Sequence, residues 1–520
     1  MTSPTAALSV TVSISPAPLT PAEVVAVARG GALVELSDEA VSALHTARAV
    51  IDDMAASGEP VYGVSTGFGA LASRYIDPEL RSALQRSLVR SHAAGAGPEV
   101  EREVVRALML LRLHTLATGH TGVHPDTAAA YSAMLNAGIT PVVHEYGSLG
   151  CSGDLAPLAH CALAVMGEGV VRDAAGVRQD AAQALRAAGI TPRELGAKEG
   201  LALINGTDGM LGMLVLACHD LRALVRHADL AAAMSVEALL GTDAVFAADL
   251  AALRPHPGQG ESAANLLRLL DGSAIMASHR VDCSTVQDAY SLRCAPQVAG
   301  AVRDTLTHAE LVASRELASA IDNPVVLDDG RVQSNGNFHG APVGYVLDFL
   351  AIAAADLASM SERRSDRMLD VARSHGLPAF LAGDPGVDSG HMIAQYTQAG
   401  LVSELKRLAA PASVDSIPSS AMQEDHVAMG WHAARKLRRG VEALGAVLAI
   451  EILTAARGLD LRTPLEPALA TGAVVALLRE AGVGGPGEDR HLAPEIAIVI
   501  DLVRSGAVLA AAEQKAGTLR

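Results

Sequence analysis

Apolar residues recur at helical spacing over long stretches of this chain, and this constrains its fold more than any other feature. The stretches cover residues 208–240, 296–320, 342–372, 395–410 and 426–457. Aromatic residues, which favour strands, make up only 2% of the chain, whereas the abundant Ala and Leu favour helices. Helices of this length are typical of bundles. The sequence therefore predicts a mainly α-helical fold, built as an elongated helical bundle.

The N-terminal region contains one further predicted helix and a polar start. Pro98 suits a first helical turn, Glu99 suits the positive end of a helix dipole, and Gly119 is a typical residue for a helix end. Residues 1–18 lack any Lys or Arg, and Ser and Thr interrupt their apolar residues, unlike a secretion signal. We expect residues 1–18 to form a flexible tail, with an edge strand as the alternative.

Charge and cysteine content narrow the partners and the compartment. The chain has 40 basic and 57 acidic residues, a net charge of −17, which argues against nucleic acid or an anionic membrane as a partner. The most apolar stretch, residues 343–360, carries Asp348 and Asp356, so we expect a buried helix there rather than a membrane span. The five cysteines include no C-x-x-C pair and are too sparse for a disulfide framework. A cytoplasmic protein is expected.

Two motifs that suggest chemistry have simpler structural explanations. Residues 63–67 match the G-x-S-x-G pattern around a hydrolase nucleophile, here Ser65, but no alternating strands and helices surround them. A serine hydrolase is therefore kept only as a remote alternative to a Gly-rich loop. His120 and His124 are spaced to share a metal on a helix, but Gly and Pro nearby disfavour a helix. We expect no metal site.

The strongest signal is the sequence GSLGCSGDLAPLAH at residues 147–160. Gly153 has no side chain, so its nitrogen can approach the carbonyl carbon of Cys151 and close a five-membered ring. Loss of water from Ser152 then leaves an exocyclic methylidene. The product is 4-methylideneimidazole-5-one, an electrophile that forms autocatalytically from Cys151–Gly153 without an external cofactor. Asp154 would begin a helix whose positive end lies near the ring.

This segment resembles the cofactor-forming signature of the aromatic amino acid ammonia-lyase family, in which Ala usually stands where this chain has Cys151. Residues 62–69 (YGVSTGFG) are similar to the mobile tyrosine loop of that family. Four later blocks resemble family motifs in the same order, namely NGTD at 205–208, QDAYSLRC at 287–294, GNFH at 336–339 and QEDH at 423–426. The resemblance extends from about residue 20 to about residue 510.

The resemblance also implies an architecture. It predicts an N-terminal part that carries the cofactor over residues 19–220, and a long central bundle with C-terminal helices over residues 221–520. It further implies a homotetramer whose active sites are shared between subunits.

Two positions indicate the substrate within this family. Ser91 and His92 stand where members acting on phenylalanine have Phe-Leu, and Ser-His is similar to members acting on histidine. An apolar wall would leave the imidazole nitrogens unpaired, whereas His92 can donate to or accept from that ring. Glu424 supplies a carboxylate that can hold an imidazole proton. The expected reaction is elimination of ammonia from L-histidine to give trans-urocanate. A phenylalanine or tyrosine lyase, or an aromatic 2,3-aminomutase with the same prosthetic group, is the alternative.

The resemblance implies roles for the remaining motif residues. Ser152 supplies the methylidene, and Tyr62 removes the β-proton, with Glu424 as the competing base. Tyr290 assists proton transfer, and Arg293 grips the substrate carboxylate in a bidentate pair.

Three further residues are expected in the pocket. Asn205 is expected to hydrogen-bond near the substrate carboxylate and the ring oxygen, while Phe338 and Gln287 shape the pocket. The sequence departs from the family near Glu424, because Met422 stands where Asn is usual.

Overall fold

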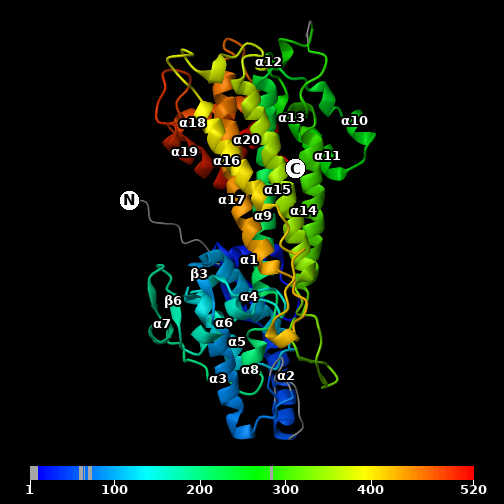
Figure 1. Ribbon diagram of the computed structural model, residues 1–520, viewed down its shortest axis with the longest axis vertical. Helices are drawn as coiled ribbons and strands as arrows, with labels where there is room; N and C mark the ends of the chain where they lie inside the picture. The colour runs from blue at the N-terminus through cyan, green and yellow to red at the C-terminus, as the bar shows by residue number, and fades with distance from the viewer. Residues whose placement is uncertain (1–9, 58–62, 64, 68–72, 282–284) are drawn as a thin grey trace. The chain divides into compact units, whose positions relative to one another are not determined.

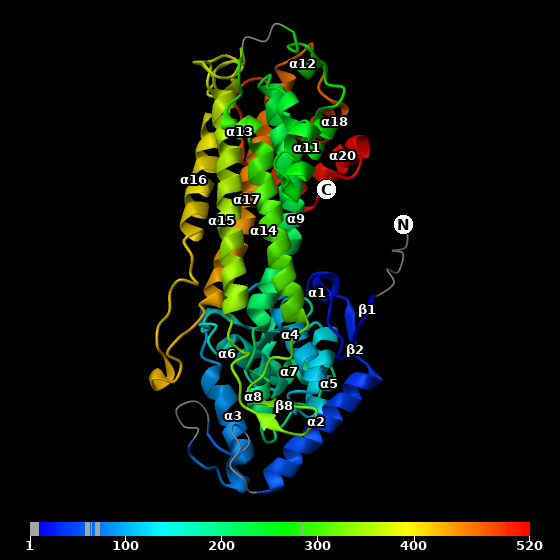
Figure 2. The same ribbon diagram turned by 90° about the vertical axis from the view of Figure 1, so that its right-hand side faces the viewer.

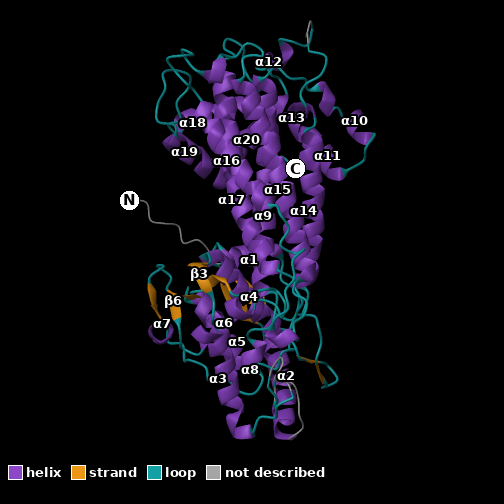
Figure 3. Ribbon diagram, viewed as in Figure 1, coloured by secondary structure: helices purple, strands orange, loops and turns teal. Residues whose placement is uncertain are grey.

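The protein is described by a computed structural model over residues 10–57, 63, 65–67, 73–281 and 285–520. Helices dominate these residues, and the strands are short (Figure 3). The prediction of a mainly α-helical fold is confirmed. The chain divides into two compact units. Unit 1 comprises Met1–Leu216, Glu310–Asp348 and Pro411–Arg435, and unit 2 comprises Ala217–Ala309, Phe349–Ala410 and Lys436–Arg520.

Unit 1 combines short helices with small two- and three-stranded sheets. Its helices are α1 (Pro21–Ala28), α2 (Asp38–Ser57), α3 (Arg81–His92), α4 (Arg102–Ala117), α5 (Pro125–Asn136), α6 (Leu155–Val165), α7 (Ala181–Ala187) and α8 (Glu199–Ala202). Its strands are β1 (Thr11–Ile14), β2 (Leu33–Leu36), β3 (Ala96–Glu99), β4 (Thr140–Pro141), β5 (His144–Tyr146), β6 (Val170–Arg172), β7 (Arg178–Asp180), β8 (Val325–Val326) and β9 (Val332–Gln333). β1 pairs with β2 in parallel, and the other pairs, β3–β5, β4–β6–β7 and β8–β9, are antiparallel. Helix α3 packs against α6 and α8, which brings the later site segments together.

Helix α4 forms the centre of the unit 1 core and carries a buried arginine that ties it to distant loops. Residues Val104–Ala117 of this helix are all buried. The guanidinium of Arg112 donates to the backbone oxygens of Ala202, Asn205 and Ile321 at 3.0–3.1 Å. It also forms an ion pair with Asp208 at 2.9 Å. A buried cation therefore fixes the backbone on both sides of Asn205, since buried charges need such partners.

Unit 2 is built mainly from long helices. Four helices have residues in both units, namely α9 (Asp208–Ala238), α14 (Ala295–Leu317), α15 (Ala341–Leu369) and α17 (Gly430–Asp460). The others in unit 2 are α10 (Ala248–Ala252), α11 (Pro257–Leu270), α12 (Ala274–Ala277), α13 (Tyr290–Arg293), α16 (Met392–Leu408), α18 (Leu469–Glu480), α19 (Ala493–Arg504) and α20 (Ala507–Ala516). Within unit 2 the long helices run side by side (Figures 1 and 2). Buried Glu451 of α17 links them by accepting from Ser235 of α9 at 2.6 Å and from Arg364 of α15 at 2.5 Å.

The long predicted helices match α9, α14, α15, α16 and α17 closely. The predicted helix at Pro98 begins later than expected, at Arg102, because Ala96–Glu99 pairs with β5 as strand β3. Residues Thr11–Ile14 form strand β1 with Val12 and Ile14 buried, so this stretch follows the edge-strand alternative rather than the flexible tail. Residues 1–9 lie outside the described residues.

Two stretches of the expected bundle belong to unit 1. Residues 310–348 and 411–435 fall within the expected 221–520 part, but their backbone bonds tie them to the segment before α6. Gly340 N–H donates to Gly150 O at 3.1 Å, and Met429 N–H donates to Leu149 O at 2.8 Å. These bonds bring both stretches to the segment that contains the Cys151–Gly153 tripeptide.

Within the part of the chain that the structure describes, one helix, α15, is long and apolar enough by length and composition to cross a membrane. Its most apolar window has a mean hydropathy of 1.6, and 61% of that window is buried within the protein. The core helix of a globular protein has the same character.

Candidate functional site

The Cys151–Gly153 tripeptide lies immediately before α6 at a point of very close backbone approach. Gly153 has φ +74°, and a Cβ added there would lie 2.0 Å from Gly206 O. Asp154 N–H donates to the same oxygen at 2.7 Å. Only glycine fits this position, because it has no Cβ and tolerates a left-handed backbone.

Asp154 anchors the tripeptide from the other side. Its side chain is fully buried and accepts from the Ser148 hydroxyl at 2.9 Å and from Met210 N–H at 2.9 Å. Burial raises the pKa of this carboxyl to about 7, although the hydrogen bonds oppose the shift. From the sequence, Asp154 is expected only to begin a helix. An acidic residue beside an otherwise apolar helix start was the available signal for a structural role.

A cavity of about 640 Å³ opens beside the tripeptide within unit 1. Four predicted site residues line it together, namely His92, Ser152, Asn205 and Glu424. Leu84, Leu88, Leu155, Leu201 and Ile204 form apolar walls, and Arg74, Asn323 and Ser420 add polar groups. The cavity combines an apolar surface with a few convergent polar side chains, as expected for a small-molecule site.

Glu424 faces the tripeptide and accepts three side-chain hydrogen bonds. Its Oε2 accepts from the Ser419 hydroxyl at 2.8 Å and from the Cys151 thiol at 3.2 Å. Its Oε1 accepts from the Ser152 hydroxyl at 3.3 Å. Burial, reinforced by Glu424, raises the pKa of the Cys151 thiol to about 12, so the thiol stays protonated and can donate.

His92, the last residue of α3, has one ring nitrogen already engaged. Its Nδ1 lies 2.9 Å from Leu88 O and therefore carries the proton, because a carbonyl oxygen can only accept. The Ser91 hydroxyl, 3.1 Å from Nδ1, itself donates to Leu88 O at 3.0 Å. Burial lowers the pKa of His92, against the opposing effects of Leu88 O and Glu424. With Nδ1 protonated, the neutral ring offers Nε2 as an acceptor.

Asn205 is also oriented by a carbonyl. Its Nδ2 donates to Asn323 O at 3.0 Å, which assigns the amide nitrogen to that side. Its Oδ1 is buried and has no hydrogen-bond partner among the described residues. Asn205 therefore lines the cavity with a side chain whose buried acceptor still lacks a donor.

Among the described residues that line this cavity, none is Gln287, Tyr290, Arg293 or Phe338. Tyr62 lies outside the described residues. Gln287, Tyr290 and Arg293 belong to unit 2, where the Arg293 guanidinium lies 4.7 Å from the centre of the Tyr290 ring. Phe338 belongs to unit 1 and is half-buried in the loop before α15.

The hydrolase and metal motifs have ordinary surroundings. Ser65 is buried in a turn beside an antiparallel bridge between Thr66 and Tyr75, which is not the strand-to-helix turn of a nucleophile elbow. His120 Nδ1 lies 2.8 Å from Val326 O, whereas His124 accepts from Asp126 N–H at the start of α5. The two histidines therefore have separate structural partners.

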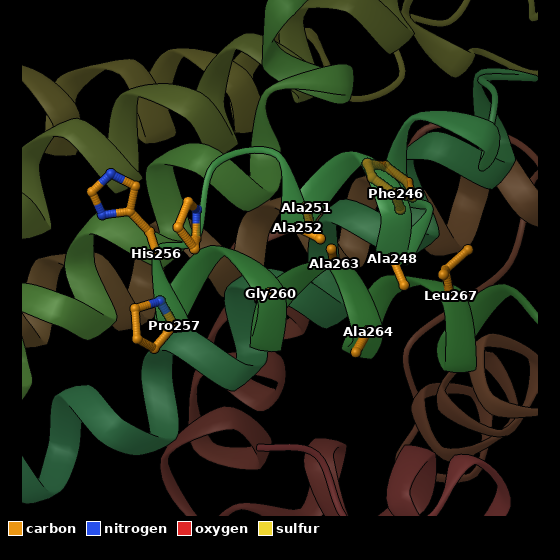
Figure 4. Close-up of a pocket in the computed structure, with 11 residues that line it drawn as sticks. Phe246, Ala248, Ala251, Ala252, His256, Pro257, Gly260, Ala263, Ala264 and Leu267 are labelled. Atoms are coloured by element: carbon orange, nitrogen blue, oxygen red, sulfur yellow. The ribbon is translucent and has the colours of Figure 1, made fainter.

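Unit 2 contains a second cavity that lacks comparable chemistry. Its volume is about 380 Å³, and Figure 4 shows Phe246, Leu267 and several alanines around it. Among the described lining residues, His256 is the one titratable side chain, and it lies 3.7 Å from Asp304. The cavity beside Ser152 is therefore the better candidate for catalysis.

Comparison with known proteins agrees with this choice. The sequence matches the aromatic amino acid lyase family over residues 19–480. It is 66% identical to histidine ammonia-lyase of Streptomyces avermitilis, over 98% of this chain and 99% of that protein. It is 65% identical to histidine ammonia-lyase of Streptomyces coelicolor, over 98% and 100% of the two chains.

Solved structures share the fold over nearly the whole chain. Histidine ammonia-lyase of Trypanosoma cruzi has a TM-score of 0.89 at 40% identity, covering 97% of this chain and 95% of that one. Tyrosine aminomutase of Streptomyces globisporus has a TM-score of 0.92 at 38% identity, covering 98% and 100%. This chain belongs to the aromatic amino acid lyase family.

Proposed function

We propose that the protein eliminates ammonia from L-histidine to give trans-urocanate. The observation that carries the proposal is the pair of polar groups, His92 Nε2 and the Glu424 carboxylate, in the cavity that also contains Ser152. A phenyl ring in this cavity would leave both groups desolvated and unpaired, which costs free energy, whereas an imidazole can pair with them. The histidine ammonia-lyases at 65–66% identity support the same substrate.

The residues around the tripeptide fit a 4-methylideneimidazole-5-one formed from Cys151–Gly153. Ring closure needs a third residue without a side chain in a tight backbone, and Gly153 against Gly206 meets that need. Asp154 and Ser148 would hold the segment on its other side. When formed, the group supplies an electrophilic methylidene that assists departure of the amine. No external cofactor is needed in this proposal.

Different cavity residues bind different groups of the substrate. His92 Nε2 accepts an N–H of the imidazole. Asn205 Oδ1 accepts from the substrate ammonium, because a carboxylate has no proton to donate to it. The Asn205 amide nitrogen carries a second N–H besides the one donated to Asn323 O, so the carboxylate contact expected from the sequence stays part of the proposal.

Proton removal and carboxylate binding use Glu424 or residues outside the described cavity lining. Tyr62 or Glu424 removes the β-proton, and Tyr290 assists proton transfer. Arg293 binds the carboxylate through its bidentate guanidinium, and Gln287 and Phe338 complete the pocket.

The proposal includes a homotetramer with active sites shared between subunits, which would supply Gln287, Tyr290, Arg293 and Phe338 to the cavity. Exposed apolar residues on the unit 2 helices support association, since Phe349 and Ile352 of α15 are 46% and 49% exposed. They line a shallow cavity of about 550 Å³ with Val298 and Val302 of α14. Light scattering at the mass of a monomer would contradict this part of the proposal. We also propose a cytoplasmic location, which the sparse cysteines support.

An assay of purified protein with L-histidine tests the function directly. We expect urocanate to accumulate, as measured by its ultraviolet absorbance, with little product from phenylalanine or tyrosine. Ser152→Ala should abolish turnover and the loss of two waters from the tripeptide, measured by peptide mass, with an unchanged circular dichroism spectrum. Full activity of Ser152→Ala would overturn the cofactor assignment, and cinnamate from phenylalanine alone would overturn the substrate assignment.

The similarity to tyrosine aminomutase makes a 2,3-aminomutase the second candidate. Chromatography of the products separates the two activities, because an aminomutase yields a β-amino acid in place of urocanate. A β-amino acid as the main product would replace the proposed reaction.

A further inference from the structure

Glu424 is held at the end of a tight turn with an unusual backbone. Ser419 and Glu424 close the turn with two backbone hydrogen bonds, Ser419 N–H to Glu424 O at 2.9 Å and Glu424 N–H to Ser419 O at 3.3 Å. Three of the four intervening residues form the 3-10 turn η5 (Ser420–Met422). Their φ values are +50°, +54° and +70°, so three consecutive residues other than glycine are left-handed. Such residues persist only where surrounding contacts hold them, and they cluster at functional sites.

The Ser419 side chain spans the base of this turn to the Glu424 carboxylate. Its hydroxyl donates to Oε2 at 2.8 Å, the shortest of the three side-chain hydrogen bonds to this carboxylate. The Cys151 thiol donates to the same oxygen at 3.2 Å. Both donors therefore act on Oε2.

The second carboxylate oxygen has a different partner. Oε1 accepts from the Ser152 hydroxyl at 3.3 Å. The proposed cyclisation removes this hydroxyl as water, whereas the Ser419 and Cys151 donors to Oε2 are retained. Among the donors that the structure describes, none then remains on Oε1.

We propose that Ser419 is a positioning residue that holds Oε2 of Glu424, so that Oε1 is the oxygen presented to the substrate. This inference rests on the proposed function, because it assigns the orientation of a carboxylate used in that reaction. Ser419 has an extended backbone, with φ −138° and ψ −179°, which Thr adopts readily. The structure therefore offers a conservative variant that keeps the hydroxyl.

A double-mutant cycle tests whether Ser419 acts through Glu424. Ser419→Ala should lower kcat/KM for histidine about tenfold or more, the loss expected for one hydrogen bond to a charged group. Ser419→Thr should restore most of it. In a Glu424→Ala background, the added Ser419→Ala should change kcat/KM less than about twofold, because no carboxylate remains to be held. Urocanate affinity should show the same lack of additivity. Calorimetry measures it on the wild-type protein, the two single Ala variants and the double Ala variant.

Controls separate positioning from general damage to the loop. Ser416→Ala removes a nearby hydroxyl that accepts from Val427 N–H at 3.0 Å and should leave kcat and KM nearly unchanged. Peptide mass should show two waters lost in every variant that keeps Ser152. Equal losses from Ser419→Ala in both backgrounds, or no loss in either, would overturn the inference. Histidine turnover by the wild-type protein is measured before the variants are compared. If the wild-type protein does not turn over histidine, the proposed function has failed, and not the inference about Ser419.

Discussion

At the scale of single residues, the turn before Glu424 contains a replaceable source of strain. Met422 has φ +70°, and its side chain is 68% exposed. Few side-chain contacts therefore offset the free-energy cost of its left-handed backbone. Asn, which the family usually has there, tolerates this conformation because its short polar side chain can bond locally. Met422 therefore departs from the family pattern at a position where the backbone conformation favours Asn.

Met422→Asn is expected to stabilise the protein by about 1 kcal/mol, the order of the cost of a left-handed residue. Urea unfolding measures the change. Gln423→Asn is the matched control, since Gln423 has an ordinary φ of −68° and should gain nothing. Equal effects of the two substitutions would show that the backbone conformation is not the cause.

Cys151 is expected to behave as a hydrogen-bond donor and not as a reactive thiol. It is 6% exposed with a pKa of about 12, so iodoacetamide near neutral pH should leave it unmodified in the folded protein. Peptide mapping by mass spectrometry reports the modification at each cysteine. Rapid labelling of Cys151 in the folded protein would show that its thiol is neither buried nor held protonated.

The sequence singled out four residues that the structure brings to one cavity, but it does not show which contacts orient them. Ser152 and Glu424 were both predicted. They are 272 residues apart in the chain, and the structure places Ser152 Oγ 3.3 Å from Glu424 Oε1. Ser419 and Ser148 were missed, because a single serine carries no pattern that distinguishes a carboxylate partner from a surface hydroxyl. The orientations of His92 and Asn205 depend on carbonyl groups of Leu88 and Asn323, which no sequence motif specifies.

At the scale of elements, hydrophobic periodicity predicted the long helices well because it repeats over many turns. It failed at Pro98, where pairing with β5 outweighs the helix-start signals of Pro and Glu. Such pairing depends on a partner strand about fifty residues away, so local propensity cannot predict it. The family resemblance assigned the stretches 310–348 and 411–435 to the bundle. Their long-range contacts with the tripeptide segment place them in unit 1 instead.

Gly153→Ala should prevent the two segments at Gly153 and Gly206 from packing. The added methyl would lie 2.0 Å from Gly206 O, so we expect no loss of water at the tripeptide and a large fall in Tm. Gly189→Ala is the control, because Gly189 has a similar φ of +69° with nothing within 4 Å of the added atom. It should cost only about 1 kcal/mol, the backbone part of the effect. Similar Tm values for the two variants would refute the steric explanation.

At the scale of the whole molecule, buried histidines couple folding to pH. His227 in α9 is fully buried, and burial lowers its pKa to about 4. Its Nδ1 lies 2.9 Å from Ala223 O, and its Nε2 has no hydrogen-bond partner among the described residues. Below about pH 6.5 the unfolded chain binds a proton at this residue that the folded chain does not. Stability is therefore lost as pH falls from about 6.5 towards 4.

His227→Phe should remove this dependence. Relative to the variant, the wild-type protein should lose about 1 kcal/mol per pH unit across that window, and nothing above it. The comparison is needed because Asp154, with a pKa raised to about 7, shifts stability in the opposite direction. Urea unfolding at several pH values measures both proteins, and parallel curves would show that His227 does not titrate on unfolding.

The contact between Gly153 and Gly206 also orders events during protein synthesis. A ribosome that has just translated the tripeptide has not yet made the backbone that confines it, because Gly206 and Met210 are more than fifty codons downstream. The carboxylate of Glu424 follows more than two hundred codons later still. A nascent chain would therefore carry an unreacted tripeptide at least until Gly206 and Met210 have been made. The electrophile would first arise where later backbone already packs against it, and not on an extended chain.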